Sequence, residues 1–257
     1  MSISVVIPYF NASSTIKDCL DSVISQTVPV MEIIVVDDAS LDEHRQYLHD
    51  LAHNYPILRI IVSIQNEGAA QSRNKGSWAA SGLWIAFLDA DDVWMPNKIQ
   101  TITPYLEKFD FISHDYGEQM AQNSNSEITL SRYSYTDFLI KNRISTPTVM
   151  VRKNKYIPFN SSYRHAEDYE VWLNYFYSNI TSIHIHATLA HGFKRAFGES
   201  GLSANMRAMY AAEVRVLVQQ RNYKRVSLIL FLLLQVLWFF KFIVRLIKIQ
   251  TRRMFHA

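Results

Sequence analysis

The first hundred residues alternate short β-branched runs with segments of helical periodicity, and this alternation is what most constrains the fold. The expected strands cover residues 3–7, 33–36, 58–64 and 84–88. Between them, apolar or small residues recur at helical spacing. Such an alternation is typical of a parallel sheet covered by helices. We therefore predict an α/β fold with a mostly parallel central sheet.

Three of these expected strands end in polar residues: Tyr9-Phe10-Asn11, Asp37-Asp38 and Asp89-Ala90-Asp91. In open α/β sheets, ligands bind at the carboxyl ends of the strands. Carboxylates are preferred ligands of Mg²⁺ or Mn²⁺, and such a cation can bridge to phosphate oxygens. The alternative is that Asp91 or Asp92 only caps a helix whose first residue is Pro96.

The remaining sequence is less regular. Residues 117–134 are polar and indicate a long loop. We expect a strand at 148–151, a helix at 169–177, a strand at 181–186 and a helix from about 204. No repeat or clear linker divides this part, so residues 1–220 are expected to be globular and residues 221–257 to form a tail.

The charge is unevenly distributed. Of the 26 Lys and Arg residues, eight lie in residues 221–257, where no acidic residue occurs; the other 18 accompany all 23 Asp and Glu residues. A nucleic-acid binder should carry its basic surface on the folded domain, so we predict no nucleic-acid partner. Neither a P-loop nor a G-x-G-x-x-G motif is present, which argues against P-loop and classical dinucleotide-binding chemistry.

Five motifs follow one another along the chain. They are Val6-Ile7-Pro8-Tyr9-Phe10-Asn11, Val36-Asp37-Asp38-Ala39-Ser40, Asn66-Glu67-Gly68 with Arg73-Asn74, Phe87-Leu88-Asp89-Ala90-Asp91-Asp92, and Glu167-Asp168-Tyr169-Glu170-Val171-Trp172-Leu173. In this order, over residues 3–203, the chain resembles the family 2 glycosyltransferases, which are inverting enzymes with a GT-A type fold. The resemblance implies a catalytic domain at 1–220, with a nucleotide-binding half (1–115) and an acceptor-binding half (116–220).

The resemblance also implies roles for particular residues. Asp38 would accept a hydrogen bond from the base imide, which favours uracil or thymine. Asp91 would bind Mn²⁺ or Mg²⁺ directly, and Asp89 would reach the ribose or a metal-bound water. Arg73 would lie near the base or diphosphate, unless it forms a surface ion pair on its helix. The expected donor-binding residues are Pro8, Tyr9, Asn11, Asp38, Asn66, Gly68, Arg73, Asp89, Ala90, Asp91 and Arg195.

On the acceptor side, Asp168 matches the family's general base, which takes the proton of the attacking hydroxyl. Its alternative role is that of a first-turn acid that stabilises the helix dipole. Glu167 and Trp172 are expected to contact the acceptor. Trp172 is equally suited to stack on a sugar ring and to pack in the core as an aromatic residue.

The third metal position departs from the family pattern. Relatives carry an Arg-x-His-x-x-Ser segment, whereas this chain has Phe197 where that histidine would fall, two residues after Arg195. His184, His186 and His191 are nearby candidates. A His-x-His pair on a strand places both rings on one face, but without a third ligand at recognisable spacing we favour a surface strand.

The tail is apolar and basic. Residues 226–240 are apolar except for Ser227 and Gln235, which is short of the about 20 residues that cross a bilayer. A span would also place five basic residues outside and three inside, against the positive-inside bias. We therefore expect a helix that lies on the cytoplasmic face of the plasma membrane, peripheral or monotopic, with Lys and Arg on the headgroups. A dimerisation or core-packing helix is the alternative.

Together with these observations, the resemblance implies an inverting, metal-dependent glycosyltransferase. It would transfer a sugar from a nucleotide-diphosphate donor, most simply a UDP-sugar, to a lipid-linked or polysaccharide acceptor in bacterial surface-polysaccharide assembly. One alternative is a non-catalytic relative that binds a nucleotide or a partner protein. Another is a nucleotidyltransferase, but that class needs a Gly-rich, basic loop after the first strand, and residues 11–14 do not supply it.

Overall fold

The computed structural model describes residues 2–117, 128–192 and 205–255, with side chains described as far as Ile247. Arg195 and Phe197 lie outside the described residues. The strands are β1 (Ile3–Tyr9), β2 (Glu32–Asp37), β3 (Leu58–Val62), β4 (Trp84–Phe87), β5 (Asp92–Trp94), β6 (Phe111–Gly117), β7 (Thr129–Ser131), β8 (Met150–Arg152) and β9 (Ser182–Gly192). The α-helices are α1 (Ile16–Ile24), α2 (Asp42–Ala52), α3 (Ala69–Ala79), α4 (Lys98–Ile102), α5 (Tyr135–Ile140), α6 (Glu167–Tyr177), α7 (Met206–Asn222) and α8 (Leu228–Phe255).

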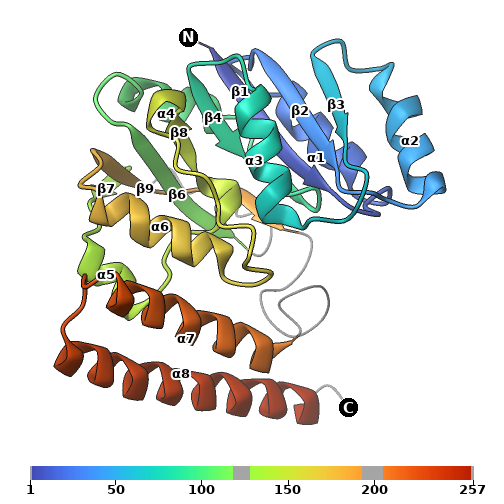
Figure 1. Cartoon of the computed structure of the whole chain (residues 1–257). Coiled ribbons are helices and arrows are strands. Elements are labelled where there is room, and N and C mark those ends of the chain that lie inside the picture. The colour runs from blue at the N-terminus through green and yellow to red at the C-terminus, as the bar shows by residue number, and fades with distance from the viewer. Residues whose placement is uncertain (1, 118–127, 193–204, 256–257) are drawn as a thin grey trace.

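These strands form one sheet in the order β3-β2-β1-β4-β8-β6-β9-β5, with β7 paired to β9. β3, β2, β1 and β4 are parallel to one another. β8 lies antiparallel between β4 and β6, and β6 is again parallel to β9. The predicted α/β class is therefore confirmed. The expected division at 115/116 falls inside β6, so one sheet runs through both halves (Figure 1).

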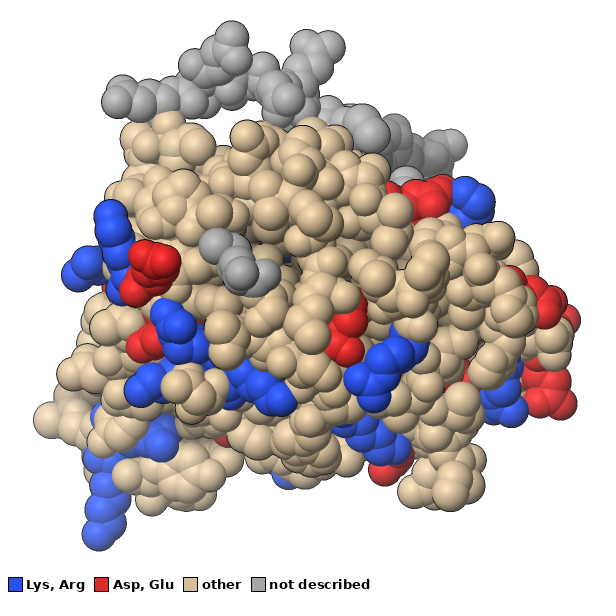
Figure 2. Space-filling model, turned by 90° about the horizontal axis from the view of Figure 1, so that it is seen from above, with Lys and Arg blue, Asp and Glu red and all other residues tan. Residues whose placement is uncertain are grey.

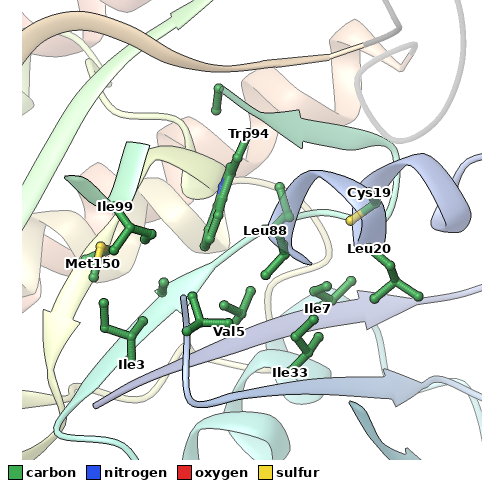
Figure 3. Packing of buried hydrophobic residues seen from close by; sticks show 14 of the residues in the cluster. Ile3, Val5, Ile7, Cys19, Leu20, Ile33, Leu88, Trp94, Ile99 and Met150 are labelled. Carbon is green, nitrogen blue, oxygen red and sulfur yellow. The ribbon is translucent and has the colours of Figure 1, made fainter. Parts of the chain in front are cut away.

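Alternating residues of β1 build the two sides of the core. Ile3, Val5 and Ile7 pack on the side of α1, where Figure 3 shows them with Cys19 and Leu20. Val6 packs on the other side, in a cluster that includes residues of α3 and α6. Because successive side chains of a strand point to opposite faces, a fully buried β1 is apolar at nearly every position.

Three helices extend the second side of the core. Figure 1 shows α6, α7 and α8 lying one below another under the sheet. Trp172 of α6 and Leu234 and Trp238 of α8 belong to the same buried cluster. The predicted boundary at 220/221 falls within α7, and the tail contributes to the hydrophobic core rather than leaving the domain.

Several short elements differ from the sequence-based expectation. Residues 111–117 form β6, and residues 135–140 form α5 with a capping box between Ser134 and Asp137. Asp92 begins the short strand β5 and does not cap a helix. The next helix, α4, begins at Lys98 behind Asn97, so the prediction of Pro96 as its first residue was wrong. Seen from above, Lys and Arg side chains lie beside Asp and Glu on the same face (Figure 2).

Candidate active site at the strand ends

The carboxyl ends of β1 and β2 and the end of β4 meet at a cavity of about 620 Å³. The start of α6 and Met209 of α7 also line the cavity. Its lining includes most of the residues predicted from sequence: Pro8, Tyr9, Asn11, Asp38, Arg73, Asp89, Ala90, Asp91, Glu167 and Asp168. Residues separated by up to 160 positions thus line one cavity. The strand-end argument predicted this for the residues that follow β1, β2 and β4.

Asp38 holds the turn that precedes α3. Its two carboxylate oxygens accept hydrogen bonds from the backbone N–H groups of Glu67 and Gly68, at 2.8 and 2.7 Å. Asn66 donates to the Asp38 carbonyl at 3.3 Å. Gly68 has a φ of +90°, and a Cβ there would lie 2.8 Å from Nη1 of Arg164. Asn66 and Gly68 therefore act behind the cavity wall, by fixing Asp38.

Arg73 joins the two halves of the site. Its Nη2 donates to Oδ1 of Asp89 at 2.7 Å, and its Nη1 donates to Oε1 of Glu167 at 3.0 Å. The residue is only 4% exposed. The alternative of a surface ion pair is therefore wrong, because a buried guanidinium ties the end of β4 to the start of α6. A charge buried in this way persists only when it is paired.

The acidic segment after β4 contacts Tyr116, which also lines the cavity and whose hydroxyl donates to Oδ1 of Asp92 at 2.7 Å. Burial and the neighbouring Asp89 carboxylate raise the pKa of Asp92 well above its usual range. Gly192 permits this contact, because a Cβ there would lie 2.1 Å from the Tyr116 hydroxyl and 2.7 Å from the Asp92 carboxylate.

Asp168 lies in the first turn of α6 and faces the same cavity. Burial, and then the charge of Glu167, raise the pKa of Asp168 to about 7. Two hydrogen bonds oppose this shift: Asn142 donates to Oδ2 at 3.0 Å and the Tyr169 N–H donates to Oδ1 at 2.7 Å. A carboxyl group with a pKa near 7 suits proton transfer at neutral pH.

The backbone is strained around this cavity. Asn11, Ala39 and Ala166 adopt φ values of 50°, 58° and 58°, and none of them is glycine. They follow β1, follow β2 and precede α6, respectively. Left-handed conformations of such residues cost free energy and are concentrated at functional sites. Each one turns the chain where a predicted site residue must face the cavity.

Asp89 and Asp91 offer the donor chemistry that a divalent cation needs. Both line the cavity, and with Asp92 they place three carboxyl groups in one short segment. Burial is the main cause of the raised pKa of Asp92, and the negative charges of Asp89 and Asp91 add to it. Carboxylate oxygens of this kind suit Mg²⁺ or Mn²⁺, so the residues present fit the predicted metal.

Comparison with known proteins identifies the family of the chain. Residues 4–179 match the family described as "Glycosyl transferase family 2". The chain belongs to glycosyltransferase family 2. The Escherichia coli UDP-Glc:alpha-D-GlcNAc-diphosphoundecaprenol beta-1,3-glucosyltransferase WfgD is 32% identical over 176 residues, which cover 67% of this chain and 68% of WfgD.

Solved structures show the same GT-A fold. Staphylococcus aureus TarS 1–349 in complex with UDP-GlcNAc aligns with a TM-score of 0.68 and 20% identity, covering 85% of this chain and 66% of TarS 1–349. The mannosyltransferase PcManGT of Pyrobaculum calidifontis, in complex with GDP-Man and Mn²⁺, aligns with a TM-score of 0.66 and 16% identity, over 86% and 64% of the two chains. The fold of this family 2 glycosyltransferase is thereby established.

One predicted acceptor residue is placed elsewhere by the structure. Trp172 is fully buried, with 0% exposure, and its ring packs edge-on against Phe111 and Phe159. It does not line the cavity, so the stacking role is wrong in this structure and the core role is correct. Asp168 and Trp172 share one face of α6, so the difference is their position along the helix: Asp168 lies in the first turn beside the cavity, and Trp172 lies one turn further on, against Phe111 of β6.

Of the histidines considered as the third metal ligand, His184 and His186 lie beside Asp115, in a cluster within the described part of the chain. His191 lies in β9 opposite Val93 of β5. Sequence reasoning did not identify several cavity residues of this family 2 glycosyltransferase. They are Tyr116, Thr146, Arg164, His165 and Met209, with Asn142 bonded to Asp168. They belong to no quoted motif, and only the topology brings them together.

Proposed function

We propose that this glycosyltransferase catalyses inverting transfer from a nucleotide-diphosphate sugar, most simply a UDP-sugar, to a lipid-linked saccharide. The observation that carries the proposal is Asp168, with a pKa of about 7, in the same cavity as Asp89 and Asp91. The name of WfgD describes transfer from UDP-Glc to a diphosphoundecaprenol-linked sugar, which supports this donor and acceptor class.

In the proposed reaction Asp168 accepts the proton of an acceptor hydroxyl as that oxygen attacks the anomeric carbon. The new C–O bond forms on the face opposite to the breaking bond to the diphosphate, so the configuration inverts. A divalent cation held by Asp91, with Asp89 beside it, would neutralise negative charge on the departing diphosphate. Arg73 holds Asp89 and Glu167 at fixed positions while this occurs, because its two ion pairs join both sides of the cavity.

Arg164 is the second cation on the wall of the cavity. Its guanidinium donates to the side chain and carbonyl of Asn66, at 2.9 and 3.2 Å, and the residue is exposed. Arg73 is already committed to two carboxylates, so Arg164 is better placed to meet an anionic donor. We assign Arg164 to the donor diphosphate, together with the predicted Arg195.

A direct test combines donor and acceptor. Purified enzyme with Mn²⁺ is incubated with radiolabelled UDP-glucose or UDP-GlcNAc and bacterial lipid extract, and label in the organic phase is measured. We expect label from at least one donor, and a loss of about 100-fold or more in Asp91→Asn. Donor binding without transfer to any lipid or polysaccharide acceptor would instead support the non-catalytic alternative.

The C-terminal helix α8 has features that would keep the enzyme at a membrane, where a lipid-linked acceptor lies. Residues Leu228–Ile247 of α8 are long and apolar enough to cross a membrane by length and composition. Exposed apolar side chains form a stripe along this helix at helical spacing: Ile229, Leu232, Leu233, Val236, Phe240, Val244 and Ile247. So large an apolar surface normally marks an interaction site.

The opposite side of α8 is bound to the domain. Arg245 donates to both carboxylate oxygens of Glu213 at 2.8 and 3.0 Å, and Trp238 donates to the Leu139 carbonyl at 2.9 Å. Lys241 donates to the Ile140 carbonyl. The expectation that Lys241 and Arg245 meet lipid headgroups is therefore wrong, because both side chains are committed to the protein.

We infer that α8 lies in the plane of the membrane and inserts its apolar stripe, with the domain on the cytoplasmic side. A crossing helix would have to leave α7 and separate Arg245 from Glu213. Replacing Leu232, Leu233 and Phe240 with serine should abolish flotation with liposomes, with the fold retained. The matched control replaces Leu41, Ile64 and Leu83, which are exposed on the rest of the domain, and should float like the wild type.

A further inference from the structure

A second cluster of chemically reactive side chains lies outside the donor cavity, on β6 and β9. Nε2 of His184 lies 3.0 Å from Oδ1 of Asp115, and Nδ1 of His186 lies 3.5 Å from Oδ2. The three ligand atoms are all within 4.8 Å of one another. Bonds of about 2.0–2.1 Å in a tetrahedral zinc site separate neighbouring ligand atoms by about 3.3 Å. The three ligand atoms are therefore close to the separation found in a zinc site.

The second ring nitrogen of each histidine lies within hydrogen-bond distance of a serine hydroxyl. Nδ1 of His184 lies 2.9 Å from Oγ of Ser113, and Nε2 of His186 lies 3.0 Å from Oγ of Ser131. Histidines that bind a metal almost always donate their second N–H to an outer partner, which fixes the tautomer. If each serine hydroxyl accepts that proton, the lone pairs of both rings point toward Asp115.

The fold explains why these residues meet. His184 and His186 alternate along β9, and Ser113 and Asp115 alternate along β6, so each pair shares one face of the sheet. In the pairing of β6 with β9, Ser113 lies opposite His184, and the register shifts immediately before and after Asp115. β7 pairs with β9 and places Ser131 opposite His184. Such irregularities commonly re-aim a side chain for a function.

The exposure and protonation of these three side chains suit the binding of a metal ion. The His184 side chain is 3% exposed, whereas Asp115 and His186 are 44% and 39% exposed, so a metal would keep a solvent-facing position. Burial lowers the pKa of His184, which favours the neutral imidazole that coordinates metals. A simple ion pair would need a protonated ring, and burial disfavours that form.

We propose that Asp115, His184 and His186 bind a divalent transition-metal ion, Zn²⁺ or a similar ion, at a site separate from Asp89 and Asp91. Two imidazoles and one carboxylate favour zinc-like metals over Mg²⁺, and three protein ligands leave a fourth position for water. The ion would tie β6 to β9 beside Tyr116, which supports Asp92. The proposal is independent of the glycosyl-transfer reaction.

The test is zinc titration of the untagged, metal-stripped full chain by isothermal calorimetry. Asp91→Asn removes the main ligand of the donor-site metal and should retain one Zn²⁺ per chain at the second site. In that background His186→Ala should lower zinc affinity at least about 100-fold, and Ser131→Ala about 10–100-fold. The matched control His53→Ala changes an exposed histidine of another region and should bind as its parent does.

Cobalt supplies a spectroscopic readout that activity cannot give. Four-coordinate Co²⁺ at a histidine-carboxylate site absorbs visible light strongly, so the band should appear in Asp91→Asn and disappear when His186→Ala is added. Circular dichroism checks that each variant is folded. If Asp91→Asn binds no zinc, or if His186→Ala binds zinc as tightly as its parent, the cluster is only a hydrogen-bonded set of ion pairs and the proposal fails.

Discussion

The surroundings of Asp168 act on the pKa of its carboxyl group in opposite directions. Burial and the charge of Glu167 raise its pKa, whereas the hydrogen bonds from Asn142 and the Tyr169 N–H stabilise its charged form. The result is a group that is ionised in a substantial fraction of molecules at neutral pH yet still basic enough to take a proton. Asn142, which belongs to no recognised motif, is therefore a positioning residue for the proposed base.

Asn142→Ala should shift the pH profile. The asparagine hydrogen bond favours the charged carboxylate, so its loss should raise the pKa of Asp168 above about 7. The ascending limb of kcat/KM should move to higher pH by up to about one unit. Asn160→Ala, in a loop outside the cavity, is the matched control. A limb that stays in place or moves to lower pH would contradict the assignment.

The same pKa predicts a stability cost. A carboxyl group whose pKa is raised on folding from 3.8 to about 7 contributes stability below pH 4, and this contribution is lost as the pH rises through 7. Asp168→Asn removes that loss. Its melting temperature should therefore exceed that of the wild type by a few degrees at pH 8, with a smaller difference at pH 4. A lower melting temperature at pH 8 would show that the charged carboxylate stabilises the fold.

At the scale of elements, β1, β2, β4 and α6 were predictable because their signals are local. Residues 3–7 are apolar except for Ser4 and are followed by Pro8, and Asp37-Asp38 follows an apolar run at 33–36. β6 was not recognised, because Ser113, His114 and Asp115 are polar although the first two are buried. Ser113 and Asp115 contact histidines of β9, and no local pattern reveals these contacts.

The site residues also fall into two groups: those that a sequence motif reveals and those that only the fold brings together. Asp38, Asp89, Asp91 and Asp168 could be found because each belongs to a motif at the end of a strand or start of a helix. Tyr116 could not, because its contact with Asp92 depends on the pairing of β6 and β5 with β9. Trp172 was ambiguous because an aromatic residue one turn after the base fits both a sugar and a core, and only packing decides.

Trp172→Phe separates those two roles. The buried side chain loses volume in a packed aromatic cluster, so the free energy of unfolding should fall by about 1–3 kcal/mol in urea denaturation. The acceptor KM should remain unchanged, because the ring does not reach the cavity. Trp78→Phe changes an exposed tryptophan and should leave both quantities unchanged. A raised acceptor KM with unaltered stability would restore the stacking role.

At the scale of the whole molecule, the tail completes the domain and also presents its apolar stripe outward. Leu234 and Trp238 are buried against the domain, so cutting the chain after Arg221 would expose its core. Figure 1 shows α8 at the base of the molecule, with α7 between it and α6. Met209 of α7 lines the cavity, so the inferred membrane surface lies one helix layer away from the site.

Membrane binding through apolar side chains should depend weakly on salt. At about 0.5 M salt, charge interactions at the membrane surface are screened over a few ångströms, whereas burial of apolar surface persists. Flotation of the full chain with zwitterionic liposomes should therefore continue at this salt concentration. Release from liposomes by salt, or flotation only with anionic lipid, would indicate that basic residues dominate the attachment.

The central claim is that Asp168 takes the acceptor proton in a cavity whose opposite wall binds the donor. The most direct measurement is steady-state transfer by Asp168→Asn at pH 7.5 with varied UDP-sugar. The predicted result is a fall in kcat of about 10²–10⁴-fold with the donor KM within a few-fold of the wild-type value. Transfer that persists within tenfold of the wild-type kcat would contradict the claim.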